Sequence, residues 1–168
     1  MRALHQGLAN GDRERHTRSR SATPGFTVTE LLIVSAIIGT LGAIAIPLYF
    51  NALENARVVR AIADITDISI RANNFRVSGD RFPNSLAEIG ADQRRDPWGR
   101  AYNYLLIRGV KNPKGVRKDK GLKPINSDFD LYSVGKDGLS EAPLTAKKSE
   151  DDIVRANDGT YVGLARDY

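Results

Sequence analysis

The chain has 168 residues, a formal net charge of +5 and no cysteine. This length suits one modest globular domain with appendages. The lack of cysteine excludes disulfides and thiolate chemistry. Both histidines, His5 and His16, precede residue 26, which excludes Ser-His, Cys-His and zinc-histidine sites from the rest of the chain. No phosphate-binding Gly-x-x-x-x-Gly-Lys sequence is present either, so we predict that the chain is not an enzyme.

The first 25 residues are basic and contain no apolar segment of their own. Their five arginines against two acids, Asp12 and Glu14, account for +3 of the formal +5. These arginines are Arg2, Arg13, Arg15, Arg18 and Arg20. A basic flank ahead of an apolar helix stays in the cytoplasm, so the C-terminal part is expected across the membrane. The remaining +2 gives little support to nucleic-acid binding.

Residues 31–49 form an uncharged run rich in Ile, Leu, Ala and Val. At roughly 1.5 Å per residue, a helix of this length just crosses a hydrocarbon core of about 30 Å. Glu30 stands at the head of the run. A carboxylate at this boundary either reaches the interface with its own side chain or binds a cationic partner. From the residues alone, both explanations of Glu30 remain open.

The junction Gly25-Phe26, with Glu30 in the fifth place after it, resembles the class III signal of type IV pilin-like proteins. The resemblance implies cleavage between Gly25 and Phe26 by a prepilin peptidase on the cytoplasmic side, and methylation of the new amino terminus. It also implies that the Phe26 amine of one subunit pairs with Glu30 of a neighbour. Gly39 and Pro47 fall where this family carries helix-softening residues, and this segment is expected to melt on assembly.

One long helix is predicted over residues 26–77. Residues 26–50 form its transmembrane half, and residues 51–78 form an amphipathic half whose apolar positions recur at spacings of three or four. These positions are Ile62, Ile65, Ala72 and Phe75, with Ser69 between them.

Proline inside this helix removes a backbone donor and clashes with the carbonyl four residues back. We therefore expect a kink or local unwinding around Gly39, Gly42 and Pro47. The alternative is a kink without functional meaning.

Residues 79–168 are expected to form a small β domain. A short helix that stops at Gly90 is predicted over residues 82–90, and Asp-Pro-Trp-Gly at 96–99 predicts a type I turn. Three segments have strand-forming composition, and the first two are expected to pair antiparallel. These segments are 102–107, 129–134 and 160–162. The predicted fold class is α+β, a pilin-like lollipop in which a long N-terminal helix packs on a small antiparallel sheet.

The segment 108–127, between the first two predicted strands, holds seven lysines and arginines against one acid, together with three glycines and two prolines. We predict a long, basic, mobile loop. It is either a solvated insertion or an electrostatic patch for DNA, anionic lipid or an acidic partner. No aromatic residue is interleaved with these charges, which argues against a platform for single-stranded nucleic acid.

Carboxylates lie at both ends of the segment 134–152. Calcium binds about six to eight oxygens, usually supplied by a loop that bends at glycine, and Asp137, Asp151 and Asp152 could supply three of them. The spacing is not that of an EF-hand. The alternative is a turn followed by acidic side chains that face solvent.

The turn at 96–99, the aromatic strand after it, and residues 129–138 with a following Asp-Asp-Ile resemble the major pseudopilin of type II secretion systems. That family binds calcium in this loop. The resemblance implies carboxylate ligands from Asp137, Asp151 and Asp152 and a backbone carbonyl ligand from Val134. It further implies a homo-oligomeric filament with other pilin-like subunits, built on an inner-membrane assembly platform.

These expectations describe a single-pass inner-membrane protein whose C-terminal domain lies in the periplasm and whose polymerisation drives type II protein secretion. A type IV pilin or minor pilin, for adhesion, motility or DNA uptake, is one alternative. The other is a membrane-anchored binding module that captures an anionic ligand with the basic loop and forms no filament.

Overall fold

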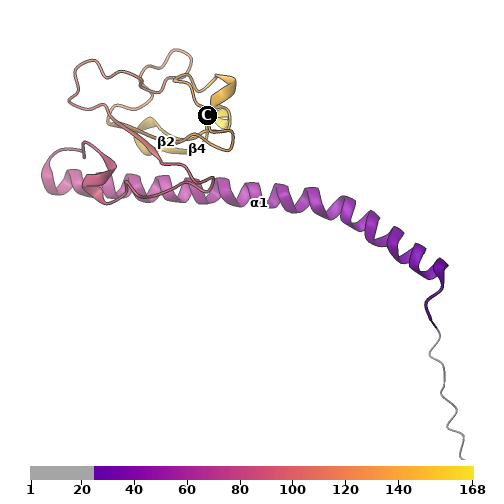
Figure 1. Ribbon diagram of the computed structural model, residues 1–168. Helices are drawn as coiled ribbons and strands as arrows, with labels where there is room; N and C mark the ends of the chain where they lie inside the picture. The colour runs from indigo at the N-terminus through magenta and orange to yellow at the C-terminus, as the bar shows by residue number, and fades with distance from the viewer. Residues whose placement is uncertain (1–24) are drawn as a thin grey trace, which may run out of the picture. The chain divides into compact units, whose positions relative to one another are not determined.

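The structure is a computed structural model that describes residues 25–168. The predicted leader, apart from Gly25, lies outside these residues. Figure 1 shows the long helix and the small sheet. In chain order the elements are the α-helix α1 (Val28–Gly79), the 3₁₀ helix η1 (Leu86–Ile89), strands β1 (Asn103–Leu106) and β2 (Phe129–Ser133), η2 (Lys147–Ser149), β3 (Ile153–Ala156), η3 (Asn157–Gly159), β4 (Tyr161–Leu164) and η4 (Ala165–Asp167). The chain divides into two compact units after residue 43.

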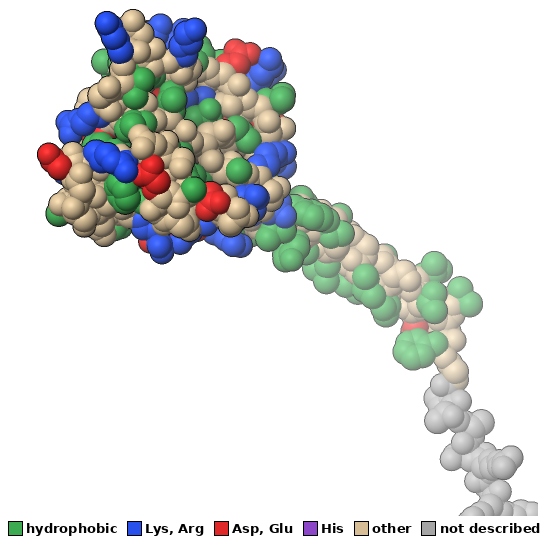
Figure 2. Space-filling model, turned by 60° about the vertical axis from the view of Figure 1, so that its left-hand side comes forward, with side chains coloured by type: hydrophobic (Ala, Val, Ile, Leu, Met, Phe, Trp, Pro, Cys, Tyr) green, Lys and Arg blue, Asp and Glu red, His purple; other side chains and the backbone are tan. Residues whose placement is uncertain are grey.

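In the first unit, α1 is apolar and carries its side chains on the surface. Leu32 and Ile38, for example, are 62% and 65% exposed. Figure 2 shows hydrophobic side chains covering this part of the helix. By length and composition α1 is able to cross a membrane, which agrees with the predicted span 26–50.

The helix runs without interruption through Gly39, Gly42 and Pro47. The local unwinding that was one of the two expectations is therefore not found in the single subunit, and melting of this stretch on assembly stays a prediction. Proline has no N–H to donate, so the carbonyl of Ala43, four residues before Pro47, lacks its intrahelical bond. Neighbouring bonds and apolar surroundings let membrane helices keep such a proline without breaking.

The second unit contains a four-stranded sheet in the order β1-β2-β3-β4, with every neighbouring pair antiparallel. Leu131 of β2 lies opposite Tyr104 of β1, and Val154 of β3 lies opposite Tyr132 of β2. The predicted antiparallel pair is confirmed as β1 and β2. The third predicted strand is confirmed as β4, which extends to Leu164. Strand β3, between β2 and β4, was not predicted.

The C-terminal part of α1 packs on one face of this sheet (Figure 1). Its buried residues recur every three or four positions, which is one face of a helix. They are Ala61, Ile65, Ile68, Ser69 and Ala72. Phe129, Leu131 and Ile153 meet them from the sheet. Each fully buried isoleucine contributes about 1.5–3 kcal/mol to folding. Of the predicted face, Ile62 and Phe75 are only half-buried.

Loops cover the opposite face of the sheet. Val154 and Ala156 of β3 point to this side, because successive strand residues alternate between faces, and they pack with Leu144 and Ile125. Ile125 comes from the basic segment 108–127.

The segment 108–127 is therefore not a solvated insertion throughout. Val116, Arg117, Ile125 and Asn126 are all 5% exposed or less. The prediction of a long mobile loop is wrong for these residues, which are packed into the domain. The remaining lysines of the segment are exposed except Lys118, which is half-buried.

Two further predictions concern residues that precede the sheet in the chain. η1 is a 3₁₀ helix and is shorter than the predicted 82–90, but Gly90 does end it in the left-handed conformation, at φ 64°. The turn at 96–99 is confirmed by a bond from the Gly99 N–H to the Asp96 carbonyl at 2.9 Å. The buried Asp96 carboxylate also accepts a bond from the Ser133 hydroxyl at 2.6 Å, which ties this turn to β2.

Candidate functional site

The start of α1 is closed by hydrogen bonds between Thr27 and Glu30. The N–H and the hydroxyl of Thr27 both donate to Oε2 of Glu30 at 2.8 Å, and the Glu30 N–H donates to the Thr27 hydroxyl oxygen at 3.2 Å. This is a capping box, in which the first residue before the helix and the third residue within it satisfy each other's free N–H groups. The spacing Thr-x-x-Glu is a sequence signal for it that was missed.

Glu30 therefore has partners within its own chain. Thr27 supplies two donors to its carboxylate, so Glu30 does not need a second copy of the molecule to satisfy it. Both bonds end on Oε2, and an ionised carboxylate accepts about four hydrogen bonds. Capping thus leaves capacity for a charged amine, and the pairing of Phe26 with Glu30 between subunits stays a prediction.

Gly25 and Phe26 lie just before the helix. Both are exposed, and the Phe26 side chain is 83% exposed. The bond between them is thus outside regular secondary structure.

The structure brings the two ends of the segment 134–152 together. Gly135 adopts φ 63° and lies so close to Asp151 that a Cβ at this position would clash with the Asp151 carbonyl. The N–H of Asp137 donates to Oδ2 of Asp151 at 2.9 Å, and Oδ1 of Asp137 accepts from the Leu139 N–H at 2.7 Å. Both carboxylates therefore bind backbone N–H groups of the loop itself.

Asp152 is buried and faces a different partner. Its Oδ2 accepts bonds from Nη2 of Arg117 and from the Ser140 hydroxyl, both at 2.6 Å. Burial raises the pKa of Asp152 to about 6, because the loss of solvation outweighs the Ser140 hydrogen bond and the Arg117 charge. Asp152 directly precedes β3, where successive side chains point to opposite sides, so it does not share a direction with Asp151.

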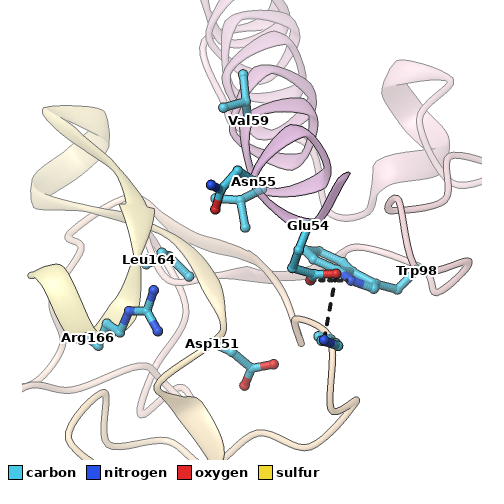
Figure 3. A pocket seen from close by; sticks show the side chains of 9 residues that line it. Glu54, Asn55, Val59, Trp98, Asp151, Leu164 and Arg166 are labelled. Atoms are coloured by element: carbon cyan, nitrogen blue, oxygen red, sulfur yellow. Dashed lines mark hydrogen bonds and ion pairs between the residues drawn. The ribbon is translucent and has the colours of Figure 1, made fainter. Parts of the chain in front are cut away.

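Asp151 and Glu54 share a pocket with two basic side chains. Asp151 lies in the lining of a pocket beside Lys136 and Arg166 (Figure 3). In the same pocket, Nε1 of Trp98 donates to Oε1 of Glu54 at 3.0 Å, and Nζ of Lys136 lies 3.9 Å from Oε2 of Glu54. The hydrogen bond between Trp98 and Glu54 connects the turn at 96–99 to α1.

Comparison with known proteins gives long matches to one kind of protein. The type II secretion system core protein G of Pseudomonas aeruginosa is 26% identical over 140 residues, which is 71% of this chain and 87% of that protein. Core protein G of Escherichia coli K12 is 24% identical over 140 residues, which is 81% of this chain and 92% of that protein. The chain is similar to type II secretion core protein G over most of its length. The predicted resemblance to the major pseudopilin is thereby confirmed.

A shorter match relates this chain to pilus proteins. A fimbrial protein of Pseudomonas aeruginosa is 39% identical over 64 residues, which is 38% of this chain and 42% of that protein. No protein-family model and no solved structure matches the chain. The matched proteins are named as secretion-system and fimbrial components, which supports the prediction that the chain is not an enzyme.

The apolar helix and the core protein G relatives are together consistent with a membrane-anchored protein whose folded part faces the periplasm. The α+β fold, with its N-terminal helix packed on an antiparallel sheet, is also as expected for the pilin-like class.

The resemblance to core protein G implies calcium, but the predicted ligands are not arranged to bind it. Among residues 25–168, no group of three or more His, Cys, Asp or Glu side chains is placed to hold a metal ion. Asp152 binds Arg117, while Asp137 and Asp151 bind loop N–H groups. Oδ1 of Asp152 has no hydrogen-bond partner among the described residues, but Asp152 points away from Asp151, so the three carboxylates do not combine toward the about six to eight oxygens that calcium takes. The carbonyl of Val134 adds at most one more.

Arg117, Arg100 and Arg155 are the residues of this region that sequence reasoning missed. All three guanidinium groups bind backbone carbonyls, and Arg117 and Arg155 also bind buried acids.

Proposed function

We propose that this chain is a structural subunit that polymerises through its N-terminal helix into a periplasmic filament, which drives type II protein secretion. The observation that carries the proposal is the extent of the similarity to core protein G, which covers 71% of this chain and 87% of the Pseudomonas protein. A type IV pilin or minor pilin is the second candidate, because of the fimbrial match. That match covers only 38% of the chain, which favours the secretion subunit.

Processing comes first in the proposed cycle. A prepilin peptidase removes the leader between Gly25 and Phe26 on the cytoplasmic side, and the new amine of Phe26 is methylated. The exposure of both residues ahead of α1 supports this step, because a peptidase could reach the bond without unwinding the helix. Residues 26–50 then hold the subunit in the inner membrane, with the C-terminal domain in the periplasm.

Assembly transfers the apolar half of α1 from lipid to a filament core. Its side chains are exposed in the single subunit, so copies of the same helix, together with other pilin-like subunits, can cover them once the inner-membrane platform extracts the chain. The hydrophobic surface then never needs to face water.

Gly39 and Pro47 are proposed to let the helix adjust during this transfer. Glycine lowers helix stability by about 1 kcal/mol relative to alanine, and Pro47 already leaves one carbonyl without a partner. Melting this stretch therefore costs fewer hydrogen bonds than melting another stretch of equal length.

The Phe26 amine and the Glu30 carboxylate are proposed to set the register of each added subunit. A buried pair of opposite charges is stable only in good geometry, so a wrongly placed subunit would leave Glu30 in an apolar core without a cation. The free capacity of the capped carboxylate supports this role.

The filament subunit and a binding module based on the segment 108–127 respond differently when the charges of that segment are removed. Replacing the exposed Lys111, Lys114, Lys120 and Lys123 by Gln spares the buried Arg117. We expect filament yield in overproducing cells to stay within about twofold of wild type, as for most exposed substitutions.

The matched control is Lys147→Gln with Lys148→Gln, which removes exposed charge elsewhere. Filament yield is measured by electron microscopy and immunoblotting of sheared fibres. If the variant with four Lys→Gln changes loses its function in cells, while it stays anchored in the membrane and the control keeps its function, the binding module is favoured over the filament subunit.

A further inference from the structure

We infer that the guanidinium groups of Arg117 and Arg100 hold the segment 134–152 closed in the place of a metal ion, so that this domain folds without calcium. The inference concerns the domain alone and does not depend on polymerisation.

Arg117 reaches three parts of the segment at once. Nη1 donates to the Ser140 hydroxyl and to the Glu141 carbonyl, and Nη2 donates to Oδ2 of Asp152, each at 2.6 Å. The side chains of Arg117 and Asp152 are 3% and 0% exposed. A planar fork of donors can join a carboxylate and a carbonyl in this way, as a cation surrounded by oxygens does.

The position of Arg117 is set by its own surroundings. Its backbone N–H donates to Oδ2 of Asp130 at 2.6 Å, and its guanidinium carbon lies 4.5 Å from the centre of the Tyr132 ring. Both partners belong to β2, next to the strand that Asp152 precedes. The basic segment 108–127 thus holds the guanidinium of Arg117 in a fixed position on the face of the sheet that the loops cover.

Arg100 holds the other end of the segment. Its Nη1 donates to the Gly135 carbonyl at 2.8 Å, and both terminal nitrogens lie 3.4 Å from the Lys136 carbonyl. Gly138, at φ 74°, packs directly against this guanidinium, and a Cβ at that position would clash with it. Carbonyl oxygens of the bend therefore bind an arginine.

Charge balance argues against a further cation at the same place. The Asp152 carboxylate is neutralised by Arg117, and a divalent ion bound to it would lie beside a buried positive charge. Like charges in a poorly solvated site repel strongly.

The test uses the full chain purified in detergent, with thermal unfolding followed by the fluorescence of Trp98, the only tryptophan. A metal that binds only the native state raises the midpoint of unfolding as its concentration rises. We expect the wild-type midpoint to differ by less than about 1 °C between millimolar calcium and excess chelator. We also expect no heat of binding when calcium is titrated in a calorimeter.

The same assay separates the role of Arg117 from that of surface charge. Arg117→Met is expected to lower the midpoint by about 10 °C, because it leaves the Asp152 carboxylate buried without a cation. Lys114→Met, in the same segment but exposed, should change it by less than about 2 °C. Arg117→Lys keeps the charge without the fork and should fall between the two.

Two results would overturn the inference. One is a wild-type midpoint that rises with calcium, or a calorimetric isotherm for calcium. The other is an Arg117→Met midpoint no lower than that of Lys114→Met.

Discussion

Glu30→Gln is expected to insert into the membrane normally and to reduce filament yield by roughly tenfold or more, because an uncharged amide cannot pair with a buried amine. Glutamine in the third helical position still accepts the capping bond from Thr27. The variant therefore removes the charge while it keeps the start of α1. Membrane fractionation measures insertion, and electron microscopy of sheared fibres measures yield.

Thr27→Val is the matched control for this experiment. It removes the hydroxyl from the capping box but leaves the Glu30 carboxylate and its bond from the backbone N–H. We expect filament yield close to wild type. Normal filaments from Glu30→Gln would contradict the pairing between subunits. Equal losses in both variants would show that the cap, and not the charge, is what assembly requires.

Asp128→Ala is expected to lower the free energy of unfolding by about 3–5 kcal/mol, the usual cost of removing one partner of a buried ion pair. Asp128 binds Arg155 through both carboxylate oxygens, at 2.8 and 2.6 Å, and the two side chains are 8% and 1% exposed. The guanidinium of Arg155 also lies 4.0 Å from the centre of the Phe129 ring. Without Asp128, this cation would stay buried against the Phe129 ring.

Urea unfolding of the full chain, followed by Trp98 fluorescence, measures this loss. Glu141→Ala is the control, because its pair with Lys148 is of similar length, 2.9 Å, but the two side chains are 48% and 56% exposed. We expect it to cost less than about 1 kcal/mol. Equal losses in the two variants would mean that the buried pair contributes no more than a surface pair.

Local patterns predicted the parts of the fold that each depend on one segment. The apolar run and the three-to-four spacing after it gave α1, the aromatic residues gave β1 and β2, and Asp96 with Gly99 gave the turn. Strand β3 was missed because it includes Arg155 and follows two acids that resembled metal ligands. A central position between β2 and β4 buries that arginine, and no local pattern reports this.

The candidate sites show the same difference between features that depend on neighbouring residues and features that depend on distant ones. The predicted processing junction and Glu30 follow from their neighbours in sequence, and so does the capping box with Thr27. The partners of Asp152 do not, because Arg117 lies 35 positions earlier and reaches Asp152 only when its segment packs over the sheet. A sequence displays the charges of a segment, but the fold decides which of them is buried and which oxygen it meets.

Intact-mass measurement of the subunit recovered from purified fibres tests the central claim most directly. The predicted mass is that of a chain that starts at Phe26 and carries one added methyl group. Fibre protein that retains the first 25 residues, or overproduced protein recovered only as single membrane subunits, would contradict a filament assembled through a freed amino terminus.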